Sequence, residues 1–343
     1  MTRIQNNERL FFGADAAHML QKQLEIHPDF FLLCDTHTQR HCLPLFKQIA
    51  GSVPNGHLLV MQAGEMHKTL ETATMLWEKL QQQGARRDSI LLDLGGGVVC
   101  DMGGFVSATW KRGMRCIQIP TSLMAQADAA IGGKCALDFG GIKNQIGCFH
   151  TPEAVCIIHD FLYTLPSEEM LSGFGEMLKH GIVADPDFFR TLRHAGENAR
   201  PDPVWIRRSA EIKQSIVLRD REEQGLRKVL NFGHSIGHVL EASAKGNLSH
   251  GAAVAHGMCA EARIAWRKGM LDVGDYEEIV QCIRQHYGPF PTPDCSRETM
   301  IRLLTADKKC SADSLNFSLP TAIGHVKTNC TVDFDEAWEA MQP

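Results

Sequence analysis

The sequence predicts an α/β N-terminal domain with a parallel sheet, followed by a mostly α-helical C-terminal domain. In the first half, helical stretches such as residues 69–83 lie between short apolar runs. This alternation is typical of a parallel sheet covered by helices. The apolar runs are residues 30–34, 58–61, 90–94, 116–119 and 155–158.

Helical periodicity dominates the second half. Residues 165–169 carry two glutamates where a helix would begin. Residues 252–267 and 276–286 are predicted to be further helices, and 315–319 a short strand. One predicted helix face carries Ile206, Ala210, Lys213 and Val217. The chain has 343 residues, which is longer than a chain that folds around a single hydrophobic core usually is. We therefore expect two domains, residues 1–160 and 161–343.

Composition and charge narrow the function classes. Hydrophobic residues make up 44% and charged residues 22%, and the net charge is −5, so no basic footprint for nucleic acid is present. Residues 1–8 lack the apolar segment of a signal peptide, and no run approaches the roughly 18 apolar residues that span a bilayer. The twelve cysteines are scattered without a C-x-x-C pair. We therefore expect a cytoplasmic protein with reduced thiols and no membrane partner.

A glycine-rich loop follows the third apolar run. Gly95, Gly96 and Gly97 are predicted to connect this strand to a helix, where glycines let a diphosphate approach the backbone. The spacing is not a G-x-G-x-x-G fingerprint, because Cys100 occupies the third glycine position. From these residues alone, a cofactor loop and a plain tight turn remain equally open.

A second glycine-rich stretch carries two lysines and an asparagine. Lys134 follows two glycines, Lys143 and Asn144 follow two more, and Asp128 precedes them. Lysine supplies a point charge and asparagine supplies directional donors, which suits a substrate dense in oxyanions. The simpler alternative is that either lysine is merely solvated.

Two helical motifs could bind a metal ion. Glu176 is expected on the same helix side as Lys179, where a surface ion pair is the simpler alternative. His234 and His238 are one helical turn apart, and His250 follows shortly after. Three histidines and a carboxylate can form an open zinc site, and spacing favours His234 with His238 as the pair of ligands. Capping and core packing are the alternative roles.

The order of the motifs resembles the 3-dehydroquinate synthase family from about residue 30 to about 325. The resemblance implies a Rossmann-like N-terminal domain and a homodimer. It rests on Gly-Glu-x-x-Lys at 64–68, Gly-Gly-Gly-Val-Val-x-Asp at 95–101, Pro-Thr-Ser-Leu at 120–123, Gly-Gly-Lys to Lys-Asn at 132–144, Glu-Met-Leu-Lys-His-Gly at 176–181, Asn-Phe-Gly-His-x-x-Gly-His at 231–238 and Ser-His-Gly at 249–251.

The resemblance implies a metal site and an NAD site. Its metal ligands are Glu176, His234 and His250, with zinc or cobalt as the metal. His238 then lies beside the substrate, in place of the ligand role that spacing favours. The implied NAD contacts are Asp35, Glu65, Lys68, Gly95, Gly96, Gly97, Asp101, Thr121, Ser122, Lys134, Lys143, Thr164 and Glu169.

The implied substrate is 3-deoxy-D-arabino-heptulosonate 7-phosphate. The implied reaction oxidises it transiently with NAD, eliminates phosphate, returns the hydride and closes the ring by an aldol step to give 3-dehydroquinate. A 2-deoxy-scyllo-inosose synthase-like cyclase is the alternative. The implied substrate and catalytic residues are Asp128, Lys134, Asn144, Lys179, Lys213, Arg227, Asn231, His238, Lys308 (or its neighbour Lys309) and Arg112, which would reach the partner subunit's substrate phosphate.

Overall fold

The computed structural model describes residues 9–54, 56–140, 142–195, 201–306, 310–311 and 314–342. Lys308 and Lys309, one of which is an expected phosphate contact, lie outside the described residues. The chain divides into two compact units, Met1–Pro166 and Ser167–Pro343. The boundary expected near residue 160 falls shortly before this division.

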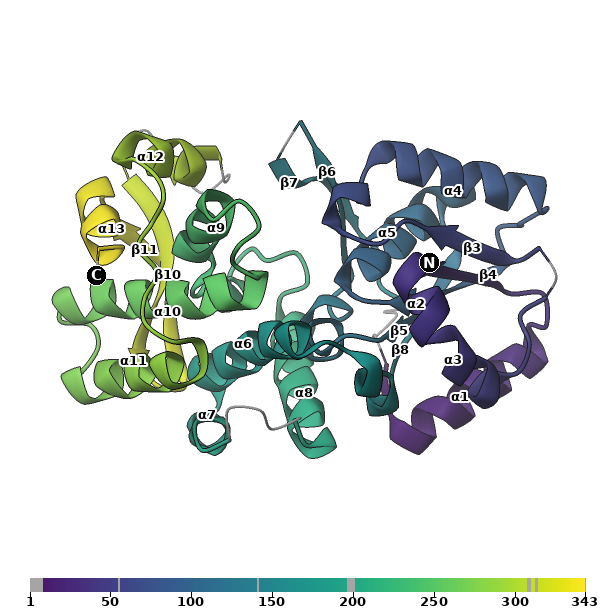
Figure 1. The fold of residues 1–343 in the computed structure, drawn as a ribbon, viewed down its shortest axis with the longest axis horizontal. Coiled ribbons are helices and arrows are strands. Elements are labelled where there is room, and N and C mark those ends of the chain that lie inside the picture. Colours follow the sequence, from purple (N-terminus) through teal and green to yellow (C-terminus); the bar gives the residue numbers. More distant parts are fainter. Residues whose placement is uncertain are drawn as a thin grey trace. The chain divides into compact units, whose positions relative to one another are not determined.

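The N-terminal unit is built on a six-stranded sheet in the order β1-β8-β5-β4-β2-β3. Every neighbouring pair is parallel, as the alternating pattern predicted (Figure 1). The strands are β1 (Leu10–Phe12), β2 (Phe31–Asp35), β3 (Leu58–Met61), β4 (Ile90–Gly95), β5 (Arg115–Pro120) and β8 (Ala154–Ile157).

Both faces of this sheet are covered by helices, which explains why its strands are mostly apolar. Leu32 belongs to the core cluster with α1 (Gly13–Ile26) and α3 (Leu43–Ala50). Phe31 and Leu33 belong to the cluster on the other face, with α4 (Leu70–Gln82) and α5 (Gly97–Thr109). Each fully buried side chain of this size contributes about 1.5–3 kcal/mol of transfer free energy.

Several shorter elements complete this unit. The antiparallel hairpin of β6 and β7 packs on α5, and the sequence pattern did not predict it. The short elements are α2 (Thr36–His41), η1 (Glu65–His67), η2 (Trp110–Arg112), η3 (Ala125–Ala129), β6 (Lys134–Phe139), β7 (Ile142–Phe149) and η4 (His159–Thr164).

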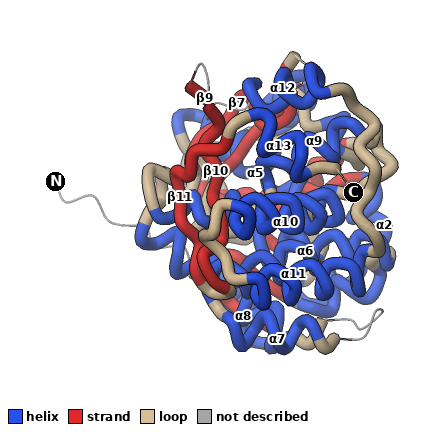
Figure 2. The backbone as a smooth tube through the Cα atoms, turned by 90° about the vertical axis from the view of Figure 1, so that its left-hand side faces the viewer, coloured by secondary structure: helices blue, strands red, loops and turns tan. Residues whose placement is uncertain are grey.

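The C-terminal unit is organised around α10, which contacts α6, α9, α11, α13 and β10 (Figure 2). The predicted helix start at 165–169 corresponds to the beginning of α6, and the predicted strand at 315–319 lies within β10. The helices are α6 (Ser167–Ala184), α7 (Pro186–Arg193), α8 (Pro203–Arg219), η5 (Leu226–Asn231), α9 (His234–Ser243), α10 (His250–Arg267), α11 (Val273–Tyr287), α12 (Arg297–Ala306) and α13 (Phe334–Ala340). The strands β9 (Cys310–Ser311), β10 (Ser314–Ala322) and β11 (His325–Val332) form an antiparallel sheet.

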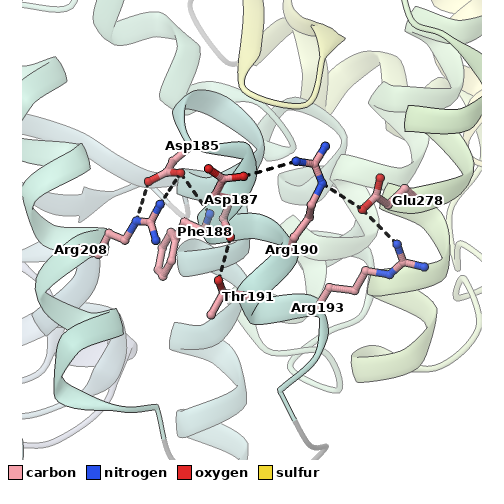
Figure 3. Close-up of polar contacts among 8 residues, drawn as sticks. All are labelled: Asp185, Asp187, Phe188, Arg190, Thr191, Arg193, Arg208 and Glu278. Atoms are coloured by element: carbon pink, nitrogen blue, oxygen red, sulfur yellow. Dashed lines mark hydrogen bonds and ion pairs between the residues drawn. The ribbon is translucent and has the colours of Figure 1, made fainter.

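Ion pairs join α7 to the two helices beside it (Figure 3). Asp185, the N-cap of α7, accepts two hydrogen bonds from Arg208 of α8, at 2.6 and 2.7 Å. Arg193 lies 3.0 Å from Glu278 of α11, and Arg190 lies 3.9 Å from the same carboxylate. A bidentate arginine–carboxylate pair is the stronger kind of surface ion pair, so the α8 contact is the firmer of the two.

Within the described residues, no helix is both long enough and apolar enough to cross a bilayer. The parallel sheet of the N-terminal unit and the helical C-terminal unit together confirm the predicted fold class.

Candidate active site

The carboxyl edge of the parallel sheet gathers the residues expected to bind NAD. In the sheet, β3 lies on the outer side of β2, whereas β5 and β8 follow β4 in the opposite direction. The order of the strands therefore reverses between β2 and β4. Open α/β sheets bind ligands at such a reversal, beyond the carboxyl ends of the strands. Each of these residues stands at or after the carboxyl end of a strand. They are Asp35 at the end of β2, Glu65 in η1 after β3, Gly95 at the end of β4, Gly96 and Gly97 after β4, Thr121 and Ser122 after β5, and Thr164 in η4 after β8.

The glycine loop after β4 fits a diphosphate. A Cβ at Gly95 would lie 2.4 Å from the Cβ of Val99, so only glycine is accepted there. Gly96 is the N-cap of α5 and offers no side chain to that helix end. The first N–H groups of the 13-residue helix therefore lack a side-chain cap, and helix N-termini of this kind bind phosphate. The Cys100 thiol is buried and faces the Gly95 carbonyl oxygen at 3.8 Å.

A polar network lies beside this loop and is centred on Lys68. The Lys68 ammonium is buried and lies 2.6 Å from the Asp101 carboxylate and 3.6 Å from that of Glu65. It also donates a 2.6 Å hydrogen bond to the side-chain oxygen of Asn144. Burial opposes the charge, but Asp101 and Glu65 outweigh it and raise the pKa of Lys68. The ammonium therefore stays charged and ties an expected substrate residue to expected cofactor residues.

The β6–β7 hairpin presents the expected lysines and asparagine. Lys134 begins β6, and Lys143 and Asn144 lie on β7. Asn144 adopts a left-handed φ of 56°, which asparagine tolerates better than most residues. The Asp138 carboxylate accepts its backbone N–H at 2.9 Å, and the Asp138 backbone donates to the Lys68 carbonyl at 2.8 Å. Sequence reasoning missed Asp138, whose only signal was an acidic residue between the two lysines.

The C-terminal unit brings Glu176, His234 and His250 together. Their ligand atoms all lie within 4.8 Å of one another. Glu176 Oε1 is 3.5 Å from Nε2 of His234 and 3.5 Å from Nε2 of His250. Those separations exceed a good hydrogen bond but match the roughly 3.3 Å between two ligands of a tetrahedral zinc ion. Oε2 of this buried carboxylate pairs with the Lys179 ammonium, while Oε1 faces the two histidines at these long distances, so the cluster fits a divalent cation.

Close helix contacts at glycine create this cluster. A Cβ at Gly251 of α10 would lie 1.8 Å from the Ser172 carbonyl oxygen of α6. A Cβ at Gly257 of α10 would lie 2.0 Å from the carbonyl oxygen of Gly233, which directly precedes α9. Gly233 itself has a φ of 82°, a left-handed conformation that favours glycine. Three helices therefore approach closely enough for their side chains to share one ion.

Two further carboxylates position the histidines. Glu261 of α10 is fully buried and accepts the backbone N–H groups of Gly233 and Ile236 at 2.7 and 3.0 Å. It thereby caps α9 at His234. Glu241 accepts from Nδ1 of His250 at 3.0 Å, which leaves Nε2 of that histidine toward Glu176. Sequence reasoning missed both, although Glu261 is an acidic residue within an apolar helical stretch.

The charges within the cluster shift its pKa values. Burial raises the pKa of Glu176, but Lys179, which forms an ion pair with it, and His234 outweigh burial and hold it well below its usual value. Burial lowers the pKa of His234, and Lys179 lowers it further. For His250, burial lowers the pKa, but the nearby carboxylates of Glu176 and Glu241 outweigh burial and raise the pKa to about 9. The carboxylate is thus ionised and ready to coordinate a cation.

His238 lies next to this cluster on the exposed side. Its ring centroid is 5.4 Å from that of His234 and 6.0 Å from that of His250. With Glu241 and His250 it forms a second group whose ligand atoms lie within 4.8 Å. The pair favoured by spacing is therefore adjacent in space, but Glu176 groups with His234 and His250.

The remaining expected substrate residues of this unit lie on α8 and η5. Lys213 and Arg227 are buried. Arg227 donates to the Arg221 carbonyl oxygen at 2.7 Å, and its backbone N–H donates to Asp220 at 2.9 Å. Asn231 donates to the Glu223 carboxylate at 2.6 Å. The turn before η5 thus holds the guanidinium and the amide in fixed positions.

Three other expected residues lie on different elements. Arg112 is exposed in a turn where it and Lys111 both have positive φ, 67° and 48°. Two adjacent left-handed residues other than glycine are strained by about 1–2 kcal/mol each. Asp128 lies on η3, and Glu169 lies in the first turn of α6.

Comparisons with known proteins give the family. A family model described as 3-dehydroquinate synthase N-terminal matches residues 58–172, and one described as 3-dehydroquinate synthase C-terminal matches residues 173–310. The chain belongs to the 3-dehydroquinate synthase family. The 3-dehydroquinate synthase of Parabacteroides distasonis is 38% identical over 323 residues, which cover 91% of this chain and 90% of that protein.

Solved structures of other cyclases share the fold of this family member. A 2-epi-5-epi-valiolone synthase from Streptomyces hygroscopicus subsp. jinggangensis, with NAD+ and Zn2+ bound, has a TM-score of 0.86 at 24% identity and covers 99% of this chain and 97% of its own. A 2-deoxy-scyllo-inosose synthase complexed with carbaglucose-6-phosphate, NAD+ and Co2+ has a TM-score of 0.83 at 22% identity. The match covers 97% of this chain and 96% of that synthase. At these identities the likeness shows the fold.

Proposed function

We propose that this chain converts 3-deoxy-D-arabino-heptulosonate 7-phosphate to 3-dehydroquinate and phosphate, with NAD as a recycled cofactor and zinc as the metal. Membership of the 3-dehydroquinate synthase family supports the reaction. The observation that carries the proposal is the Glu176–His234–His250 cluster, three ligands within 4.8 Å of one another. Three protein ligands leave the open position that catalytic zinc requires.

The cofactors would add chemistry that side chains lack. Bound NAD would supply reversible hydride transfer, and a bound zinc ion would supply Lewis acidity toward substrate oxygens. Glu176, His234 and His250 would hold the metal, and the uncapped start of α5 at Gly96 and Gly97 would hold the NAD diphosphate. The two relatives solved with NAD+ and a divalent cation share this fold.

The protein's own residues would bind and orient an anionic substrate. Arg227, buried and fixed by the Arg221 carbonyl oxygen, suits a carboxylate because its fork of donors matches two oxygens. Lys134 and Asn144 would supply a charge and a directional donor. The buried Lys179 ammonium, paired with Glu176, would add a positive charge beside the reacting hydroxyl groups.

The later steps depend on geometry. Once the hydroxyl beside the acidic C–H has been oxidised, phosphate can leave and can itself take the proton. Ring closure then requires the open chain to be held in a reactive conformation, and such positioning can supply several kcal/mol of a barrier. The fixed donors of η5 and the β6–β7 hairpin are the parts suited to this role.

Phosphate release tests the reaction. Purified protein with 3-deoxy-D-arabino-heptulosonate 7-phosphate, metal and a trace of NAD should release phosphate without accumulating NADH, and a chelator should stop it. Glucose 6-phosphate, which lacks the carboxylate, is the matched control substrate. Release from glucose 6-phosphate alone would replace the proposal with an inosose-forming cyclase.

The assignment of Glu176, His234 and His250 as metal ligands has its own test. We expect His234→Ala and His250→Ala to lose the metal, and His238→Ala to retain it, as measured by metal analysis of the purified variants. Circular dichroism serves as the folding control. Loss of metal from His238→Ala together with retention in His250→Ala would assign the site to the pair favoured by spacing.

We also propose a cytoplasmic homodimer in which Arg112 reaches the phosphate of the partner subunit's substrate. The exposed, strained turn that presents Arg112 supports this role. Light scattering should give twice the chain mass, and Arg112→Ala should weaken substrate binding while leaving the dimer intact. A monomer with full activity would contradict it.

A further inference from the structure

Two cysteines face each other across the β6–β7 hairpin. Cys135 and Cys148 are register partners in the antiparallel ladder. Directly opposed residues in such a ladder have Cα atoms about 4.5–5.5 Å apart, within the roughly 4.4–6.8 Å that a disulfide spans. Directly opposed residues of a ladder carry their side chains on the same face of the hairpin. Backbone position and side-chain direction therefore both allow an S–S bond.

The two thiols differ in reactivity. Cys148 is half-buried, and its interaction with Cys135 lowers its pKa. Cys135 is buried, and its interaction with Cys148 together with burial raises its pKa. A half-buried thiol of lowered pKa opposite a buried thiol of raised pKa is the arrangement of a reactive cysteine with a resolving cysteine.

Other cysteines of the N-terminal unit lack this combination. Burial raises the pKa of Cys34 to about 12 and of Cys42 to about 11. Cys156 is fully buried, and its pKa is raised for the same reason. Thiols in such surroundings stay protonated and inert, so oxidation is directed to the hairpin.

We propose that Cys135 and Cys148 form a reversible intramolecular disulfide that switches the enzyme off under oxidation by a peroxide. The Cys148 thiolate attacks one oxygen of hydrogen peroxide, giving a sulfenic acid and hydroxide. The Cys135 thiol then attacks that sulfur, the S–S bond forms, and water leaves. In sum, two thiols lose two electrons and two protons to one peroxide, which becomes two waters. A dithiol reductant reverses the change.

The disulfide acts on the site through the hairpin. Cys135 Sγ packs against α5, where a Cβ on Gly104 would lie 2.2 Å from it. Bonding to Cys148 at about 2.05 Å draws the sulfur away from this contact. Lys134 directly precedes Cys135, and Asn144, on the opposite strand, holds Lys68. A displacement of about 1 Å at such positions can lower catalysis about 100-fold.

Oxidation of metal- and NAD-loaded protein with graded hydrogen peroxide tests the switch. Non-reducing peptide mapping should show a peptide pair linked through Cys135 and Cys148. Phosphate release should fall about 10- to 100-fold and recover with dithiothreitol. Cys148→Ser should keep its activity through the same treatment. Cys295→Ser, the matched control at another half-buried cysteine, should remain as sensitive as the unmodified chain.

The inference rests on the proposed function for its activity readout. Two other measurements distinguish a failure of the disulfide switch from a failure of the proposed function. Absence of the linked peptide, with Cys148 carried to sulfinic acid instead, overturns the disulfide whatever the enzyme does. If the reduced protein releases no phosphate, calorimetric NAD binding replaces activity, and oxidation should weaken it about 10-fold through the Asn144–Lys68 contact. A linked peptide with unchanged activity and unchanged NAD affinity overturns the switch.

Discussion

Replacing Gly251 by alanine should disrupt the metal site without touching a ligand. The new Cβ would lie 1.8 Å from the Ser172 carbonyl oxygen and 2.5 Å from its carbon, whereas real Cβ contacts essentially never fall below 3.0 Å. Because both neighbours are backbone atoms, α6 and α10 must separate by about 1.2 Å at this point. His250 directly precedes Gly251, and Glu176 lies one turn beyond Ser172 on α6, so two ligands move apart.

The magnitude follows from two effects. Metal sites tolerate errors of about 0.2 Å in ligand distance, so a 1.2 Å separation should lower metal affinity at least 100-fold. Overpacking costs about 1–3 kcal/mol of unfolding free energy, and the hydrogen bond from the Gly251 N–H to Ser172 Oγ, now 3.1 Å, adds about 1 kcal/mol when broken.

Chelator competition and urea unfolding measure these effects. Gly274→Ala is the matched control, because its Cβ would meet only the Asp272 side chain at 3.1 Å. It should leave metal affinity unchanged. Wild-type affinity and stability in Gly251→Ala would refute the argument that the glycine contact sets the ligand spacing.

Three further changes should each give a distinct result. Glu241→Gln should weaken metal affinity about 10- to 100-fold by chelator competition with little loss of fold, because the ring of His250 loses its charged orienting partner; unchanged affinity would contradict the role. Arg227→Ala should raise the substrate Kd at least 10-fold in calorimetry while NAD binding stays constant, and an unchanged substrate Kd would remove it from the site. Burial lowers the pKa of His256 from 6.5 to about 4. As the pH falls from 6.5 to 4, His256 is therefore protonated in the unfolded chain but stays neutral in the folded chain. Stability should fall by roughly 3 kcal/mol between pH 6.5 and 4, and His256→Gln should lessen that fall in urea unfolding of the chelated protein; an equally steep fall would locate the acid sensitivity elsewhere.

Much of the N-terminal unit could be predicted from the sequence. Strands buried on both faces are mostly apolar, so runs such as 58–61 and 90–94 stand out, and β3 and β4 coincide with them almost residue for residue. The β6–β7 hairpin was not predicted. Its polar and glycine residues, such as Lys143 and Gly147, hide the alternation that marks a strand.

Local sequence patterns indicated which residue types form the site better than they indicated which of those residues lie together. Histidine spacing on one helix favoured His234 with His238, because a sequence shows only neighbours along the chain. The structure groups His234 with Glu176 of α6 and His250 of α10. The positioning carboxylates, such as Glu261, carry no local pattern, since their partners are backbone N–H groups of another helix.

The α/β-then-α order, the glycine loop after β4 and the family to which the chain belongs could be inferred from the sequence. Those features depend on local periodicity and on motifs whose residues are contiguous. The family resemblance implied that Glu176 meets His234 and His250, which local spacing did not. The three-dimensional structure shows this grouping and also that Cys135 faces Cys148. Ligand spacing and cross-strand register are set by how closely backbones approach. That approach depends on contacts such as Gly251 against Ser172, between residues far apart in the chain.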